Sequence, residues 1–141
     1  VTDAQLRVGG SPGTVAVGDV ARFPNACYDD VPRRIEHWQV AVDTSSYAAR
    51  TLVADLLDGE GPEPFGTIPT FWSDQAAVSL RALGQPGLGT EVRVLEGDLA
   101  TESAVGYLRD GTLVGVVLLG LAKAMGRYLQ RLTAELQGAP A

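Results

Sequence analysis

The sequence predicts an α+β fold in which an opening strand and a long helix are followed by a small antiparallel sheet with a closing C-terminal helix. Three patterns lead to this prediction. Residues 14–21 form a mostly apolar run, residues 37–58 repeat apolar side chains every three or four positions, and residues 70–119 contain several stretches typical of strands.

Length and composition limit the possible functions. A chain of 141 residues is long enough for one domain with a core but short for two. Its net charge of -6 argues against general binding to nucleic acid or to an anionic membrane. The longest apolar run, residues 113–119, is too short to span a membrane, and no signal-peptide pattern is present. We therefore expect a cytoplasmic protein, and the single cysteine, Cys27, fits a reducing compartment.

The opening stretch ends at a candidate ligand site. Residues 1–8 alternate as a strand or hairpin edge does, and glycines and a proline then break the chain. The apolar run that follows suits the interior of a parallel sheet and ends at Gly18 and Asp19. Open α/β sheets bind ligands at this end of their strands. Gly18 would let a ligand approach closely, and Asp19 would offer two acceptor oxygens to the hydroxyls of a sugar or sugar alcohol.

A long helix is predicted after a loop at residues 22–32. Two starting points are compatible with the sequence. Either Asp30 caps the helix, with Pro32 in the first turn, or residues 33–36 stay extended and the helix begins near His37. Residues 59–64, rich in glycine and proline, end the helix and form the expected linker. One apolar face of this helix is made by Trp38, Val42, Ala49, Leu52, Val53 and Leu56.

The second half of the chain predicts an antiparallel sheet. Strands are expected at residues 70–73, 77–83, 91–96, 104–109 and 112–119. Asp110 and Gly111 separate the last two and favour a type I′ hairpin turn. A closing helix, expected to stop at Gly138 and Pro140, carries a stripe of Ala122, Met125, Leu129, Leu132 and Leu136.

Three motifs in a fixed order carry a family resemblance. They are SPGTVAVGDVARFPN at residues 11–25, RRIEHWQVAV at 33–42 and IPTFWSDQ at 68–75. Together they closely resemble the C-terminal part of the FAD-dependent ferredoxin reductases, which use NAD(P)H and include putidaredoxin and rubredoxin reductases. The resemblance runs from residue 1 to about residue 119. It implies a residual FAD-domain strand and long helix at residues 1–58, and a reductase C-terminal domain for interfaces or dimerisation at residues 65–141.

The resemblance assigns residues to FAD. Asp19 would accept hydrogen bonds from the ribityl chain, although an acid that caps a nearby turn is the plainer alternative. The start of the long helix would face the pyrimidine side of the flavin, where backbone N–H groups and the helix dipole favour negative charge. Trp38 could equally be a core residue, and the lone His37 makes neither a metal site nor a catalytic triad. The implied FAD neighbours are Gly18, Asp19, Val20, Glu36, His37 and Trp38.

The resemblance also implies a docking surface for an iron–sulfur partner. Trp72 would be an interface anchor, or else ordinary sheet packing. Arg22, Arg33 and Arg34 could attract an acidic ferredoxin, or could be ordinary solvated arginines. Cys27 is expected to be a passive small residue because its acidic neighbours disfavour a thiolate.

We therefore interpret the chain as a C-terminal fragment of a flavoprotein that passes electrons from NAD(P)H through FAD to a ferredoxin-type protein. No Gly-x-Gly-x-x-Gly phosphate fingerprint is present, so the chain alone is expected to be inactive and to lack FAD. Gly120-Leu121-Ala122 stands where family members often have Asn-Arg-Pro, which leaves a homodimer through the last helix open. Two alternatives remain: a non-enzymatic interaction or dimerisation domain, and a flavin oxidoreductase with another acceptor, such as rubredoxin or a quinone.

Overall fold

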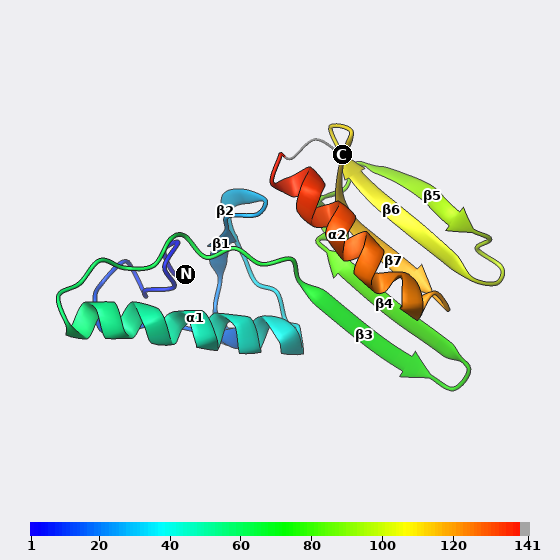
Figure 1. Ribbon diagram of the computed structural model, residues 1–141. Helices are drawn as coiled ribbons and strands as arrows, with labels where there is room; N and C mark the ends of the chain where they lie inside the picture. Colours follow the sequence, from blue (N-terminus) through cyan, green and yellow to red (C-terminus); the bar gives the residue numbers. More distant parts are fainter. Residues whose placement is uncertain (139–141) are drawn as a thin grey trace. The chain divides into compact units, whose positions relative to one another are not determined.

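The computed structural model describes residues 1–138, which form two compact units, Val1–Thr67 and the residues from Ile68 onward. The first unit holds a two-stranded sheet and the longer helix, and the second holds a five-stranded sheet and the shorter helix (Figure 1). The fold class is therefore the predicted α+β. In chain order the elements are β1 (Phe23–Asn25), β2 (Asp29–Arg33), α1 (Trp38–Leu56), β3 (Thr70–Gln75), β4 (Val78–Gly84), β5 (Glu91–Gly97), β6 (Ser103–Arg109), β7 (Thr112–Leu119) and α2 (Met125–Leu136).

The opening segment of the first unit is not the parallel-sheet strand that its composition predicted. Residues 14–17 pair only through an isolated antiparallel bridge between Arg7 and Val15. Every strand pair in the described part of the chain is antiparallel. Residues 1–8 likewise form bridges and not a regular strand. A run of three apolar residues cannot specify its pairing partner, and here the side chains of Val15, Ala16 and Val17 pack, partly buried, against the core of the first unit.

A buried ion pair fastens this segment to the last turn of α1. The Nη2 atom of Arg7 lies 2.6 Å from a carboxylate oxygen of Asp55, and both side chains are largely buried. Asp55 also accepts a hydrogen bond of 2.8 Å from the backbone N–H of Gly13. The hydrogen bond from Arg7 holds the pKa of Asp55 below its ordinary value. The irregular N-terminal segment is thus held by a paired, hydrogen-bonded charge and not by a regular sheet.

A short antiparallel pair, β1 and β2, occupies the region predicted to be a loop. Phe23 anchors this pair, because its ring is buried and lies edge-on to the ring of Phe65 at 5.3 Å. The side-chain amide of Asn25 donates a hydrogen bond of 2.8 Å to the carbonyl of Thr67. The prediction failed because the prolines and aspartates of this stretch are typical of loops, and only Phe23 indicated burial.

Helix α1 begins at Trp38, with His37 as an extended N-cap residue. This is the second of the two predicted starts, since residues 33–36 precede the helix without belonging to it. The face of α1 that enters the core differs from the apolar face predicted. The buried positions are Val40, Thr44, Tyr47, Ala48 and Thr51.

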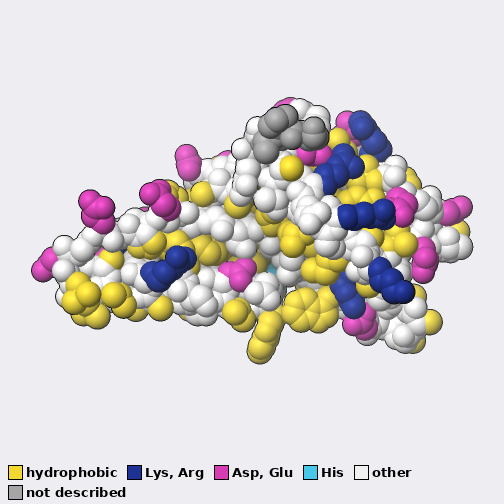
Figure 2. All heavy atoms as spheres, viewed as in Figure 1, with side chains coloured by type: hydrophobic (Ala, Val, Ile, Leu, Met, Phe, Trp, Pro, Cys, Tyr) yellow, Lys and Arg dark blue, Asp and Glu magenta, His cyan; other side chains and the backbone are white. Residues whose placement is uncertain are grey.

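The predicted apolar face of α1 lies largely at the surface. Trp38 is 77% exposed and Leu56 is 78% exposed, and Val42 and Val53 are exposed as well. Hydrophobic side chains are accordingly visible on the surface along α1 (Figure 2). The repeat of apolar residues correctly located a helix, but it did not show which side would be buried.

The residues that follow α1 return to the core of the first unit. The ring of Phe65 packs edge-on against Tyr47 at 5.1 Å, and its backbone N–H donates a hydrogen bond of 2.7 Å to the carbonyl of Ala4. In the predicted linker at residues 59–64, the carbonyl of Glu63 accepts a hydrogen bond from the hydroxyl of Tyr47. The predicted linker is therefore part of the first unit and packs on its core.

The sheet of the second unit confirms the five predicted strands. Their order is β3-β4-β7-β6-β5, and all pairs are antiparallel. The turn between β6 and β7 is the predicted Asp110-Gly111 hairpin, and both residues have the positive φ, 52° and 81°, that a type I′ turn requires. The alternating pattern and the turn chemistry therefore agree, which is why this half was predictable from sequence.

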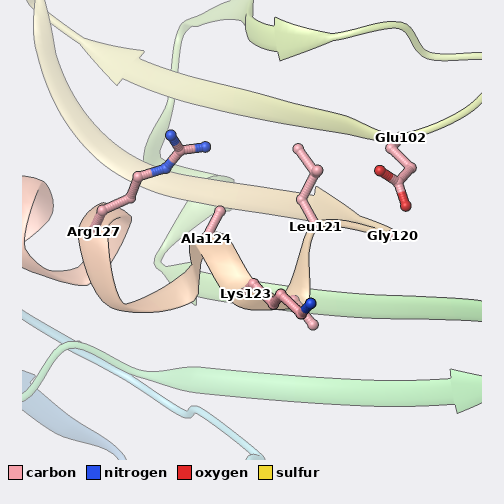
Figure 3. A pocket seen from close by; sticks show the side chains of 7 residues that line it. Glu102, Gly120, Leu121, Lys123, Ala124 and Arg127 are labelled. Carbon is pink, nitrogen blue, oxygen red and sulfur yellow. The ribbon is translucent and has the colours of Figure 1, made fainter.

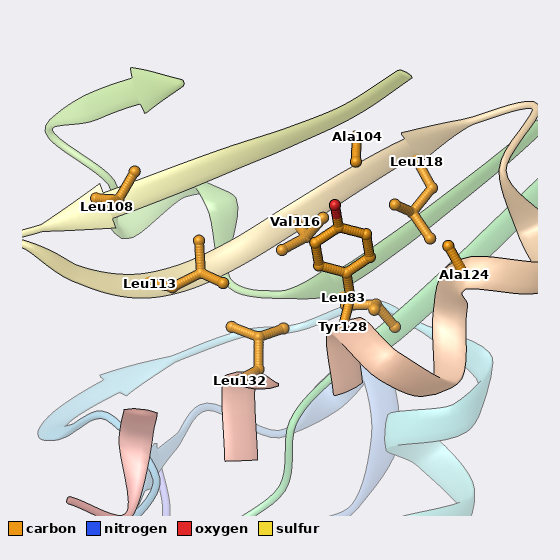
Figure 4. Close-up of a cluster of buried hydrophobic side chains, with 9 residues drawn as sticks. All are labelled: Leu83, Ala104, Leu108, Leu113, Val116, Leu118, Ala124, Tyr128 and Leu132. Carbon is orange, nitrogen blue, oxygen red and sulfur yellow. The ribbon is translucent and has the colours of Figure 1, made fainter. Parts of the chain in front are cut away.

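Helix α2 closes one face of this sheet (Figures 1 and 4). Leu132 is fully buried among side chains of β4, β6 and β7, and Tyr128 is buried beside it. Ala122 precedes the helix in a short 3₁₀ turn, while Met125, Leu129 and Leu136 pack at the edge of the core. The predicted stripe is thus confirmed for the inward face, and Tyr128 adds to it. The predicted stop at Pro140 lies outside the described residues.

None of the helices within residues 1–138 is long and apolar enough to cross a membrane. Among the same residues, no three histidine, cysteine or acidic side chains gather in a way that could hold a metal ion.

Candidate functional site

A tight turn at Gly18–Val20 forms the first part of the candidate site. These residues make one turn of 3₁₀ helix, which closes through a hydrogen bond of 2.9 Å from the N–H of Ala21 to the carbonyl of Gly18. Gly18 has φ +64°, a left-handed conformation that favours glycine. A Cβ atom on Gly18 would lie 3.3 Å from the Cβ of Ala41 in α1. The turn therefore packs directly on the helix, and only glycine allows this approach without strain.

The start of α1 forms the second part. Its N-cap residue, His37, makes no side-chain capping bond, and the first turn carries no acidic residue. The first N–H groups of a helix have no acceptor within the helix, and the helix dipole makes this end positive. Such an end can stabilise negative charge on a ligand.

The structure brings the predicted carboxylate and this helix start together within the first unit. Asp19 lies exposed at the middle of the turn that packs on Ala41. Burial lowers the pKa of His37, and the negative charge of Asp19 offsets part of that decrease. The turn that carries Asp19 is hydrogen-bonded to α1, because the N–H of Gly18 donates to the hydroxyl of Thr44. A mainly neutral imidazole at neutral pH follows from the lowered pKa.

The remaining predicted flavin neighbours lie around the same helix start. Val20 and Trp38 are exposed, so neither is a core residue. Glu36 is exposed and lies 3.6 Å from Arg34 in an ion pair. Sequence reasoning missed Thr44, which is fully buried and accepts a hydrogen bond of 3.1 Å from the N–H of Gly18. Nothing in the local sequence marks this threonine, because its partner is 26 positions away.

The three predicted docking arginines make separate contacts. Arg22 donates a hydrogen bond of 2.9 Å to the carbonyl of Pro32. Arg33 is paired with Asp29, and Arg34 with Glu36. Two of the three positive charges are thus partly neutralised by neighbouring carboxylates.

Cys27 offers no reactive centre. Burial raises the pKa of its thiol, which disfavours the thiolate.

Trp72, the predicted anchor for a partner, lies on β3 in the second unit. Its side chain is 47% exposed and stands opposite Arg81 of β4. The guanidinium of Arg81 pairs with Asp74 at 2.7 Å. Trp72 is therefore a half-exposed aromatic residue on an edge strand, beside a charged pair. That environment allows contact with another protein.

The second unit also contains a hollow of about 580 Å³ where β7 leads into α2 (Figure 3). Glu102, Lys123 and Arg127 provide its charged groups. The guanidinium of Arg127 is paired with Glu96. The ammonium of Lys123 is the second positive charge at the rim of this hollow. None of the predicted site residues lies here.

Comparisons with known proteins place these features in a family context. The family described as "Reductase C-terminal" matches residues 70–140. The chain is 35% identical, over 121 residues, to the ferredoxin reductase subunit of 5,5'-dehydrodivanillate O-demethylase from Sphingobium sp., covering 84% of this chain and 28% of that protein. It is 32% identical, over 112 residues, to monodehydroascorbate reductase from Pisum sativum, covering 77% of this chain and 25% of that protein.

A solved structure agrees with the fold. The covalent complex of putidaredoxin reductase with putidaredoxin contains a chain that matches with a TM-score of 0.79 and 26% identity, covering 95% of this chain and 30% of that chain. The present chain therefore spans less than a third of the length of each of these proteins.

Proposed function

Because the chain belongs to the reductase C-terminal family, we propose that it forms the C-terminal part of an FAD-dependent reductase that passes electrons from NAD(P)H to a ferredoxin-type iron–sulfur protein. The family and the names of the relatives support a reductase role. The observation that carries the flavin part is the packing of the Asp19 turn on the uncapped start of α1.

The residues at this site fit a flavin. Gly18 permits close approach of backbone to helix, and Asp19 supplies two acceptor oxygens suited to the hydroxyls of a ribityl chain. The uncapped helix start offers N–H donors and a positive dipole end. When bound there, FAD would supply the redox chemistry of hydride uptake and single-electron release, and these residues would hold and orient it. No residue of this chain needs to act as a catalytic acid or base in that scheme.

Each part of the site then has a physical task. Asp19 holds and orients the polyol by accepting hydrogen bonds. The first amides of α1 stabilise negative charge at the pyrimidine edge of the flavin. His37, kept mainly neutral by burial, does not add a full positive charge beside that edge. Glu36, Val20 and Trp38 border the same place, and the exposed ring of Trp38 gives the flavin an apolar neighbour.

The phosphates of FAD and the NAD(P)H would be held by parts of the reductase beyond these 141 residues. The chain contains no Gly-x-Gly-x-x-Gly fingerprint, and its relatives are more than three times as long as the segment that it matches. The exposed apolar face of α1 supports this, since such faces commonly pack against further protein. We expect the chain by itself to be colourless and inactive, and the whole reductase to work in the cytoplasm.

The flavin assignment is tested by Asp19→Ala in the reductase that contains this chain, with Asp74→Ala as a control at an exposed acid of the second unit. Loss of the two acceptor oxygens should lower FAD affinity by about tenfold or more, the effect of one or two charge-assisted hydrogen bonds. The ratio of flavin to protein absorbance after dialysis measures this. Equal flavin retention in Asp19→Ala and the control would remove the role of Asp19.

For the partner, we propose that Trp72 anchors an acidic ferredoxin and that Arg22, Arg33 and Arg34 attract it. Interface hot spots are enriched in tryptophan and arginine, and the putidaredoxin reductase structure is of a complex with putidaredoxin. Trp72→Ala should slow NAD(P)H-dependent reduction of ferredoxin by about tenfold while leaving reduction of a small dye nearly unchanged. Equal loss of both activities would indicate a damaged fold instead.

Another acceptor is the second candidate, because plant monodehydroascorbate reductases are also among the relatives. The purified reductase would distinguish these acceptors directly in parallel assays with ferredoxin, rubredoxin, a quinone and monodehydroascorbate. A purely structural interaction or dimerisation domain is favoured only by the self-contained core of the second unit. A reductase preparation without flavin would support that reading, and analytical ultracentrifugation would report a homodimer.

A further inference from the structure

We propose that Thr44 is the positioning residue of the flavin site: its hydroxyl fixes the Gly18–Val20 turn against the start of α1. The inference rests on the proposed function for the flavin itself. The contacts that support it lie entirely within the first unit.

The hydroxyl of Thr44 joins the two parts of the site. It accepts a hydrogen bond of 3.1 Å from the backbone N–H of Gly18 and donates one of 2.7 Å to the carbonyl of Val40. The side chain of Thr44 is completely buried. One hydroxyl has a single donor hydrogen and two acceptor lone pairs, so both bonds can form together. The turn is thereby tied to the first turns of α1 through one atom.

This bond controls where Asp19 points. Gly18 immediately precedes Asp19, and its N–H is the group that Thr44 holds. A Cβ atom on Gly18 would lie only 3.3 Å from the Cβ of Ala41, so the turn has one polar bond to α1 and no room for a side chain beside the helix. If the polar contact is lost, the left-handed glycine can relax and the carboxylate moves relative to the helix amides. The separation of the carboxylate from those amides decides whether one ligand can use both.

A buried threonine at this position is otherwise unexpected. Valine has nearly the same shape and would bury without a polar group, but it would leave the N–H of Gly18 without an acceptor. The chain offers a matched control two helical turns away. Thr51 is equally buried on the same face, and its hydroxyl donates a hydrogen bond of 2.9 Å to the carbonyl of Gln5, far along the helix from Asp19.

The experiment compares Thr44→Val, Thr44→Ser and Thr51→Val. In this chain, NMR-detected amide exchange measures the opening of Gly18. In the reductase that contains it, FAD affinity, the visible spectrum and the midpoint potential of the flavin report the site. Thr44→Val should raise exchange at Gly18 by about tenfold and weaken FAD binding by a similar factor, as expected for one buried hydrogen bond. Thr44→Ser should restore both, and Thr51→Val should change neither, even if it lowers overall stability.

Three results would separate the alternatives. Unchanged exchange at Gly18 in Thr44→Val would overturn the positioning role. A change in exchange with FAD affinity, spectrum and potential equal to those of Thr51→Val would show a structural role only, and would also overturn it. A wild-type reductase that holds no FAD would overturn the proposed function and the purpose of Thr44, while Gly18 exchange would still show whether Thr44 fixes the turn.

Discussion

The two helices of this chain bury different kinds of face. Helix α2 turns Tyr128 and Leu132 inward and leaves Arg127 exposed, as an amphipathic helix normally does. Helix α1 buries two threonines and leaves Trp38 and Leu56 exposed. The buried threonines are possible because each hydroxyl bonds to the backbone of a distant segment. Apolar periodicity therefore located both helices but identified the inward face of only one.

The two units differ accordingly in how much apolar helix surface they leave exposed. The second unit closes an apolar core between α2 and its five-stranded sheet. The first unit also has an apolar core, but irregular segments are in addition bonded to α1 through polar groups, and one apolar face of α1 stays at the surface. The exposed apolar face of the first unit agrees with the proposal that this chain is one part of a larger reductase.

The largest expected effect tests the core of the second unit. Leu132→Ala removes a fully buried side chain from the sheet–helix interface and should lower the free energy of unfolding by about 2–5 kcal/mol. Amide exchange in β6 and β7 measures this locally. A comparable loss of protection in α1 would show that the two units unfold together, and the second unit would then not be independently stable.

The matched control is Leu56→Ala, on the exposed face of α1. Because Leu56 is 78% exposed, the change should alter the unfolding free energy of this chain by no more than about 0.5 kcal/mol. A cost similar to that of Leu132→Ala would mean that the apolar face of α1 is already covered in solution.

A smaller effect should appear in how the free energy of unfolding of the first unit depends on pH. Burial lowers the pKa of His37 below its usual 6.5, so the unfolded first unit binds a proton at a higher pH than the folded unit does. The free energy of unfolding of the first unit should therefore fall as pH drops from about 6.5 toward the lowered pKa, and it should be constant above that range. The negative charge of Asp19 reduces the size of this step.

Urea unfolding of the chain at pH 7.5 and pH 5.5, followed through amides of α1, measures the step. His37→Gln should abolish this pH step, since the sequence contains a single histidine. The same decline in the variant would assign the pH effect to other groups.

Local sequence signals explain which parts of the fold were predictable. The Asp110-Gly111 turn and its flanking strands are specified by neighbouring residues, so alternation and turn chemistry located the β6–β7 hairpin and its turn. The segment at residues 14–17 depends on partners elsewhere in the chain, and three apolar residues do not specify which segment they pair with. Phe23 in β1 was missed for the same reason, because its ring packs on Phe65 from beyond α1.

In the candidate site, too, residues in a local motif were predicted and a residue with a distant partner was not. Gly18 and Asp19 were predicted as site residues from a motif, and the structure packs their turn against α1. Thr44 was not identified, because its role depends on a hydrogen bond across 26 residues. The ion pairs of Arg33 with Asp29 and of Arg34 with Glu36 join residues close in the sequence, so local spacing could have indicated them.

The strand order of the second unit has a consequence for how the molecule assembles. Strands β3 and β4 form one local hairpin, and β5, β6 and β7 form a separate meander. The pairing of β4 with β7, here called the β4–β7 seam, joins these two pieces into one sheet. Closing that seam brings together segments separated by the whole β5–β6 hairpin, which costs more chain entropy than either local piece. We expect the hairpin and the meander to form early during folding and the β4–β7 seam to form last. Slow folding and transient strand-edge exposure should therefore concentrate at that seam.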